Sequence, residues 1–207
     1  MSLLRRLFLI VLLALTPAFA LASASQAQTL PPVTAADRVL GQADAPVTVV
    51  EYASFVCPHC AHWQATVFPE FKSRFIDTGK VKLVFRDLPT SPQNVASAAA
   101  MVGRCAAPGR FFAVAASFFA GQPALIAGGD GRVWFDNAIA QSGQTKEQMQ
   151  ACFADPARSV ALTADINAAV AAGVNGTPTF FVNGKALAGD TDIEALATAI
   201  AAATPGT

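Results

Sequence analysis

Residues 47–68 read VTVVEYASFVCPHCAHWQATVF, and this stretch decides the fold. Its first part, VTVVEY (47–52), is rich in β-branched residues and predicts a short buried strand. After Cys60, apolar residues recur at the helical spacing of four: Trp63, Val67, Phe71 and Phe75. The two cysteines of CPHC therefore stand at the junction between a strand and a helix.

The helix that follows is expected to end at Thr78-Gly79, with a kink or local break at Pro69. VKLVF (81–85) then predicts a second strand. On the N-terminal side, QTLPPVTAA (28–36) is a polar, proline-bearing lead-in that we expect to be flexible.

The middle of the chain, about residues 92–172, is rich in alanine and predicts three to five helices. Its paired phenylalanines could line a groove, but packing in a core is favoured because apolar residues at helical spacing usually face one. Thr145 and Gln148 form a capping-box pattern that opens one of these helices.

Strand patterns return after Gly173. Residues 179–182 predict a strand, Asn183-Gly184 a hairpin turn, and residues 185–188 the returning strand. Thr191 and Glu194 form a second capping-box pattern, which predicts a final helix to about residue 202.

The spacing of Cys57 and Cys60 fits several kinds of site. Covalent haem attachment needs a histidine directly after the second cysteine, and Ala61 stands there. Zinc needs two more ligands at a suitable spacing; His59 and His62 are near, but a second CxxC is lacking. A structural disulfide across two residues would be a strained ring, and strained disulfides are the reactive kind. A redox pair is the favoured interpretation, and no metal is expected.

Each position of CPHC has a physical role in redox chemistry. A helix start at Cys57 favours its thiolate through unpaired N–H groups and the helix dipole. Pro58 suits the first helical turn, and a protonated His59 adds positive charge. Cys60, one turn further, is expected to be buried with a higher pKa, so that it resolves or re-forms the bond.

The N-terminus predicts export. Arg5 and Arg6 precede an apolar run and then a series of small residues, which is the order of a secretory signal peptide spanning residues 1–27, with cleavage near residues 24–27. Without the two arginines, 12 basic and 14 acidic residues remain of the 14 and 14 in the full chain, giving 12 − 14 = −2. This near-neutral balance argues against a nucleic-acid partner. A periplasmic or secreted location is expected.

Cys105 and Cys152 lie in the helical middle region without a motif around them. An exported protein with an even number of cysteines favours disulfides. We expect a structural disulfide between these two, with a pair of buried free thiols as the alternative.

Three stretches together resemble the DsbA-like thiol–disulfide oxidoreductases of the thioredoxin superfamily: GQADAPVTVVEYASFVCPHC (41–60), the helical middle region, and GVNGTPTFFVNG (173–184). The resemblance implies an α/β, thioredoxin-like fold with an inserted α-helical domain. Residues 28–90 and 173–207 would form the thioredoxin-like domain, and residues 91–172 the insert.

By position, the resemblance assigns roles to single residues. Cys57 corresponds to the nucleophilic, solvent-facing cysteine and Cys60 to its buried partner. Glu51 falls where a buried acid assists proton transfer at the second cysteine. Thr177-Pro178 matches the loop whose cis-proline faces the CxxC and whose backbone pairs with the substrate peptide.

The resemblance implies an enzyme that introduces disulfides into reduced, unfolded secreted polypeptides through the Cys57–Cys60 pair, without a cofactor. A DsbB-like membrane reoxidase is the expected partner, and the protein is expected to be a monomer. Thr177 also occurs in isomerases and reductases of the family, so a reductase or isomerase is the alternative. From other classes, a peptide-binding or chaperone module with a CxxC that does not cycle, and a metal-binding module, stay open.

Overall fold

The computed structural model describes residues 30–187 and 191–204. The expected signal peptide, residues 1–27, and its cleavage site near residues 24–27 lie outside this part of the chain. Among the described residues, no helix combines the length and the apolar character needed to cross a membrane.

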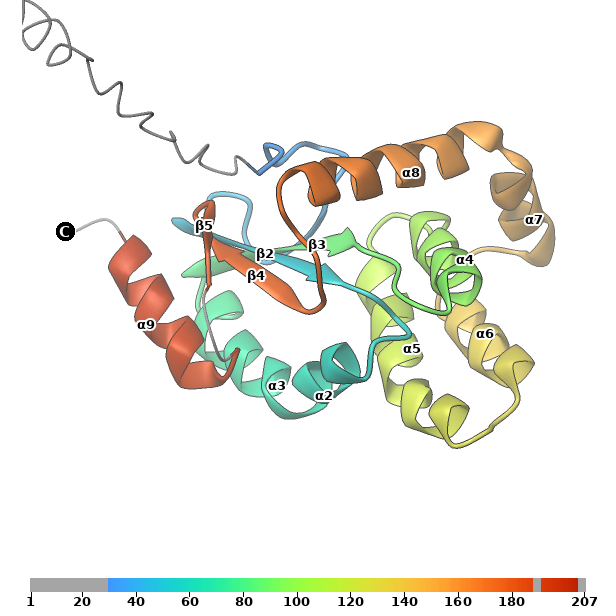
Figure 1. The fold of residues 1–207 in the computed structure, drawn as a ribbon, viewed down its shortest axis with the longest axis horizontal. Helices are drawn as coiled ribbons and strands as arrows, with labels where there is room; N and C mark the ends of the chain where they lie inside the picture. Colours follow the sequence, from blue (N-terminus) through green and yellow to red (C-terminus); the bar gives the residue numbers. More distant parts are fainter. Residues whose placement is uncertain (1–29, 188–190, 205–207) are drawn as a thin grey trace, which may run out of the picture.

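A five-stranded mixed sheet forms the centre of the molecule, with the strand order β1-β3-β2-β4-β5 (Figure 1). The central strands β2 and β3 run parallel, and the other neighbours pair antiparallel. The strands are β1 (Arg38–Leu40), β2 (Val47–Ala53), β3 (Val81–Asp87), β4 (Thr179–Val182) and β5 (Lys185–Ala186). The strands predicted over 47–52, 81–85 and 179–182 are thus confirmed, while β1 has no counterpart among the sequence predictions.

Helices cover this sheet and extend beyond one end of it (Figure 1). They are α2 (Pro58–Thr66), α3 (Phe68–Phe71), the π-helical turn η2 (Lys72–Ile76), α4 (Gln93–Arg104), α5 (Phe111–Ile126), α6 (Gly131–Ala140), α7 (Lys146–Ala154), α8 (Pro156–Ala171) and α9 (Ile193–Ala203). The break expected at Pro69 occurs just before it, because α2 ends at Thr66 and α3 begins at Phe68 with Pro69 in its first turn.

The two faces of the sheet are buried by different helices. Side chains of a strand alternate between faces, so Val49 and Tyr52 of β2 point in opposite directions. Val49 packs in a buried cluster with Leu196 of α9. Tyr52 belongs to another buried cluster, with Ala169 of α8. Figure 1 shows α3 and α9 on one side of the sheet and α8 on the other.

The helices α4–α8 follow β3 and precede β4, which agrees with an α/β fold that carries a helical insertion. Phenylalanines pack their core, as expected from their spacing: Phe118 is fully buried, and its ring centroid lies 4.9 Å from that of Phe55. Phe55 belongs to the segment that connects β2 to α2. The core of the insertion is therefore continuous with the segment that leads into CPHC.

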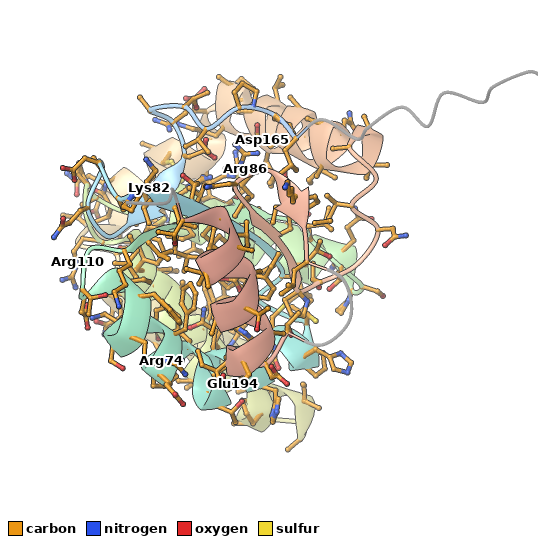
Figure 2. The ribbon with its side chains drawn as sticks, turned by 90° about the vertical axis from the view of Figure 1, so that its left-hand side faces the viewer. Arg74, Lys82, Arg86, Arg110, Asp165 and Glu194 are labelled. Carbon is orange, nitrogen blue, oxygen red and sulfur yellow. A yellow bond between two sulfur atoms is a disulfide. The ribbon has the colours of Figure 1, made fainter. Side chains whose placement is uncertain are left out.

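Ion pairs join segments that are distant in the sequence. Arg74 of η2 bonds Glu70 at 2.9 Å and Glu194 of α9 at 3.0 Å, and Figure 2 shows Arg74 and Glu194 next to each other. All three side chains are substantially exposed, so each pair contributes little free energy, typically about 0–1 kcal/mol. They mark the contact between the two segments.

The N-terminal lead-in is held on the sheet, at least from Pro31 onward. Arg86 of β3 donates hydrogen bonds to Asp37 at 2.9 and 3.1 Å and to the backbone carbonyls of Pro31 and Pro32 at 2.8 and 2.9 Å. It also donates to the Tyr52 hydroxyl at 3.1 Å. The expectation of a flexible lead-in over 28–36 is wrong for its described part, because one guanidinium fixes it at several points.

One of the two predicted helix starts needs correction. The capping box of Thr145 and Gln148 is present in full at the start of α7. At α9, however, the cap is Asp192 instead of Thr191, and its carboxylate accepts a hydrogen bond from the Ala195 N–H at 2.8 Å. Aspartate and threonine both cap helices well, so the sequence pattern alone left the position open by one residue.

Candidate active site

Cys57 lies where the sequence places the start of the helix. The chain leaves β2 at Ala53, and Cys57 is the N-cap of α2, with extended backbone angles of φ −80° and ψ 119°. Pro58 occupies the first helical position, where a missing N–H costs no hydrogen bond. The N–H groups of the first turn are therefore free to stabilise negative charge on the Cys57 sulfur.

The surroundings of Cys57 favour its thiolate strongly. A hydrogen bond from the Cys60 thiol lowers the pKa of Cys57 to about 5, against the opposing effect of burial. The backbone N–H groups of His59 and Cys60 lower this pKa further. Because neutral pH lies above that value, the Cys57 side chain is mostly thiolate at pH 7.

Cys60 has the opposite character. Its side chain is 0% exposed, and burial raises the pKa of its thiol far above the ordinary value; the Cys57 sulfur and the Glu51 carboxyl raise it further. Both cysteines are free thiols in this structure. Two neighbouring thiols with pKa values moved apart form an asymmetric pair: the chemistry open to Cys57 is that of a nucleophile or leaving group, while Cys60 keeps its proton at neutral pH.

The pair is less open to solvent than the sequence implies. The Cys57 residue is only 7% exposed, whereas Pro58 and His59 beside it are exposed. The expectation of a solvent-facing Cys57 is therefore wrong for its own side chain. Solvent contacts the CPHC segment mainly at Pro58 and His59. A partner polypeptide would meet these two residues first.

The Thr177–Pro178 loop lies against Cys57, as the resemblance implies. The Thr177–Pro178 peptide bond is cis, and the Cys57 thiol donates a hydrogen bond to the Thr177 carbonyl oxygen at 3.2 Å. A thiolate cannot donate, so ionisation of Cys57 releases this contact. Hydrogen bonding from the Thr177 side chain also lowers the pKa of Cys57.

Glu51 is a buried acid in the middle of β2. It is 0% exposed, and neither carboxylate oxygen has a hydrogen-bond partner in the described part of the chain. Burial raises the pKa of this carboxyl to about 8. By strand alternation it points to the same face as Val49 and Ala53, and Ala53 packs in one cluster with Cys60. A group with these properties can store a proton inside the protein near neutral pH.

Sequence reasoning missed one polar residue at this site. Gln122 of α5 is 1% exposed, and its side-chain amide donates hydrogen bonds to the backbone carbonyls of Phe55 and Cys57 at 2.9 and 2.8 Å. A signal was present, because Gln122 is the larger of two polar residues, with Ser117, in the mostly apolar run FFAVAASFFAGQPALI. A polar side chain in such a helix needs a buried partner.

Cys105 and Cys152 are joined by a disulfide in this structure. Cys105 caps the C-terminal end of α4, Cys152 lies in α7, and their Cα atoms are 5.9 Å apart. The bond closes a loop over a sequence separation of 47 residues within the helical insertion. Groups of three or more His, Cys, Asp and Glu side chains that could hold a metal ion do not occur among residues 30–187 and 191–204.

The geometry invites comparison with known proteins. Residues 34–202 match the protein family described as Thioredoxin. The chain belongs to the thioredoxin family. This match begins just before β1 and ends within α9, so the thioredoxin family relationship covers the sheet, the CPHC segment, the helical insertion and the Thr177–Pro178 loop.

A similar relative is a protein of Rickettsia bellii (strain RML369-C) named "Putative protein-disulfide oxidoreductase", which is 34% identical over 150 residues. That alignment covers 72% of this chain and 57% of the relative; a related protein of Rickettsia conorii is covered over 59%. The chain thus spans less than two thirds of the length of these curated relatives.

Two solved structures share the fold. BdbD from Bacillus subtilis in its oxidised form is 24% identical with a TM-score of 0.73, covering 86% of this chain and 98% of that one. Alpha-DsbA1 from Wolbachia pipientis is 25% identical with a TM-score of 0.72, covering 84% and 93%. Both resemblances extend over the helical insertion as well as the sheet, so the thioredoxin-like fold of this chain is of the DsbA type.

Proposed function

We propose that the protein is a thiol:disulfide oxidoreductase that introduces disulfide bonds into reduced, unfolded polypeptides through Cys57 and Cys60. The observation that carries this proposal is the pair of opposed pKa shifts: lowered to about 5 for Cys57 and raised for Cys60. A stabilised thiolate is a good leaving group, which makes the disulfide easy to reduce and therefore oxidising.

The proposed reaction has two exchanges. A substrate thiolate attacks the Cys57 sulfur of the Cys57–Cys60 disulfide, the bond between the cysteines breaks, and Cys60 leaves and takes up a proton. A second substrate thiolate then attacks the substrate sulfur of the mixed disulfide, and Cys57 leaves as a thiolate. The substrate has lost two electrons and gained a disulfide, and the enzyme has become a dithiol.

Other residues would assist at stated atoms. Glu51, buried with a pKa of about 8, would exchange a proton with the Cys60 sulfur. Both side chains are fully buried, so bulk water cannot deliver or remove this proton directly. Pro58 and His59, exposed next to Cys57, would contact the incoming polypeptide. The Thr177–Pro178 loop would pair through its backbone with the substrate chain. No cofactor enters this scheme.

The proposal includes location and partners. An exported protein with the signal peptide of residues 1–27 would act in the periplasm or outside the cell on secreted polypeptides. Its dithiol form would pass electrons to a membrane reoxidase of the DsbB type, and the protein would act as a monomer. The insertion over 91–172 would be a domain in its own right beside the thioredoxin-like part.

The test is oxidation of a reduced model protein, such as a small secreted protein with several disulfides, by the purified, oxidised chain. We expect stoichiometric disulfide formation. Cys57→Ser and Cys60→Ser should each abolish it, because neither variant can form the Cys57–Cys60 disulfide that oxidises the substrate. Undiminished oxidation by Cys57→Ser would refute the proposal.

The direction of the reaction is tested by the reduction potential of the Cys57–Cys60 pair in glutathione buffers. A potential well above that of thioredoxin, about −270 mV, supports an oxidase. A value near thioredoxin's would instead favour a reductase or isomerase, for which Thr177 gives some support because the family resemblance associates a threonine there with those enzymes. Peptide binding that survives loss of both cysteines would favour a chaperone module.

A further inference from the structure

Gln122 is a buried amide in the helical insertion. Its Nε2 atom lies 2.9 Å from the Phe55 carbonyl oxygen and 2.8 Å from the Cys57 carbonyl oxygen. It therefore uses both of its N–H groups on the segment that carries the nucleophilic cysteine. That segment is 65 to 67 residues away in the sequence.

This contact is distinctive within its surroundings. Helix α5 packs against α2 through apolar side chains such as Phe118 and Phe119. No other side chain of α4–α8 makes a hydrogen bond with residues 54–60 in the part of the chain that the structure describes. Burying a primary amide costs free energy unless its N–H groups are hydrogen-bonded. The folded state therefore favours backbone positions in which the Phe55 and Cys57 carbonyls stay within reach of Gln122.

The proposal rests on the oxidoreductase function argued above. We propose that Gln122 is a positioning residue for the redox pair: by holding the Phe55 and Cys57 carbonyls, it makes the helical insertion fix the backbone from which the Cys57 sulfur projects.

Gln122 affects the Cys57 thiolate through charge as well as through position. The Cys57 carbonyl oxygen carries partial negative charge only a few bonds from the Cys57 sulfur, and it already accepts the first helical hydrogen bond, from the Ala61 N–H at 3.2 Å. The amide hydrogens of Gln122 offset part of that charge. They also hold the first turn of α2 so that the His59 and Cys60 N–H groups face the sulfur. Loss of the amide therefore disfavours the thiolate on both counts.

The experiment compares two variants of the full chain. Gln122→Met keeps an unbranched side chain of similar size but has no N–H to donate. Trp134→Phe is the matched control: Trp134 is buried in the same insertion and donates its Nε1–H to the Phe118 carbonyl at 2.8 Å, not to residues 54–60. Each variant removes a buried hydrogen-bond donor, and both should lose stability.

The readout is the pKa of Cys57 in the reduced protein, followed by the thiolate absorbance near 240 nm. In Gln122→Met we expect this pKa to rise by at least about 0.5 unit, a roughly threefold change in the dissociation constant, with a matching shift of the glutathione equilibrium toward a less oxidising disulfide. Trp134→Phe should leave both quantities unchanged. An unchanged pKa in Gln122→Met, or an equal shift in both variants, would overturn the proposal.

A measurement on the unaltered protein covers the case in which Gln122→Met does not fold. The two side-chain amide protons of Gln122 should give separate NMR signals and exchange slowly with water. Fast exchange would contradict their fixed attachment to the carbonyls of Phe55 and Cys57. Failure of the oxidase proposal is distinguishable, because it appears as inactivity of the unaltered protein, whereas the pKa comparison does not depend on activity.

Discussion

Replacement of Glu51 by glutamine should make the stability of the protein depend differently on pH. Burial raises the pKa of this carboxyl from an ordinary 4.5 to about 8, and neither of its oxygens has a hydrogen-bond partner among the described residues. Between these two pH values the native state keeps a proton that the unfolded chain has released. The native state is therefore the one that binds more protons.

The sign and the size follow from this proton count. The contribution of Glu51 to the free energy of unfolding falls by about 1.4 kcal/mol per pH unit across the window, because at this site the unfolded state binds one proton fewer. The window runs from 4.5 to about 8, so the total loss attributable to Glu51 is roughly 5 kcal/mol. The contribution is fully present below pH 4.5 and is lost as the pH rises through 8.

A glutamine side chain cannot ionise, so the Glu51→Gln variant lacks this contribution. The quantity to measure is the difference in unfolding free energy between the variant and the unaltered protein, from urea titrations of the reduced proteins at several pH values from 4 to 9. We expect the difference to rise by roughly 5 kcal/mol in favour of the variant. The lowered pKa of Cys57 has the opposite effect on stability, but it is common to both proteins and cancels in the difference.

Glu147→Gln is the matched control, because it removes one carboxylate from an exposed position in the first turn of α7. We expect its difference from the unaltered protein to stay within about 0.5 kcal/mol. A Glu51→Gln difference that is as flat with pH as that of the control would refute the reasoning from burial.

Three further outcomes are expected. The thiolate absorbance of the reduced protein should titrate with a midpoint near pH 5 and vanish in Cys57→Ser. The same lowered pKa should give the reduced protein a stability contribution that grows from pH 5 to 9, measured as its difference in unfolding free energy from Cys57→Ser; a midpoint near 9 would contradict both. Replacing Cys105 and Cys152 together by alanine should cost about 4 kcal/mol in urea unfolding, given the loop of 47 residues, and a cost below about 1 kcal/mol would mean that the disulfide does not restrain the unfolded chain. Phe118→Ala should cost about 3–5 kcal/mol in the same assay, because the side chain is fully buried against Phe55, and a smaller loss would show that the core collapses around the gap.

Much of the sheet could be predicted because its central strands are locally distinct. Residues 47–52 and 179–182 carry β-branched and aromatic residues between turn signals, and they form β2 and β4. β1 could not be predicted in this way. It has only three residues, Arg38–Leu40, and exists through its antiparallel pairing with β3, which is a tertiary interaction.

The features of the candidate site are likewise of two kinds: some follow from local sequence rules, and others depend on tertiary contacts. The positions of Cys57 and Pro58 at the helix start follow from local rules of capping, and a sequence pattern records such rules. The hydrogen-bond partners of buried polar groups cannot be predicted from such local rules, because they come from segments that are distant in the sequence. Gln122 became part of the site only through the packing of α5 against the CPHC segment. The low exposure of Cys57 is likewise a property of the folded molecule that the CPHC pattern does not record.

The separation between Cys57 and Thr177 also has a consequence for the order in which the molecule matures. The two residues in contact are 120 positions apart, and β4, which follows Thr177, pairs with β2 beside Glu51. A ribosome therefore finishes the CPHC segment long before it makes the strand that encloses it. Until β4 has been made and has joined β2, the Cys57 sulfur lacks the Thr177 wall and Glu51 lies on an open strand edge. The growing chain thus carries Cys57 and Cys60 in an unfinished setting, which is completed only when β4 has paired with β2.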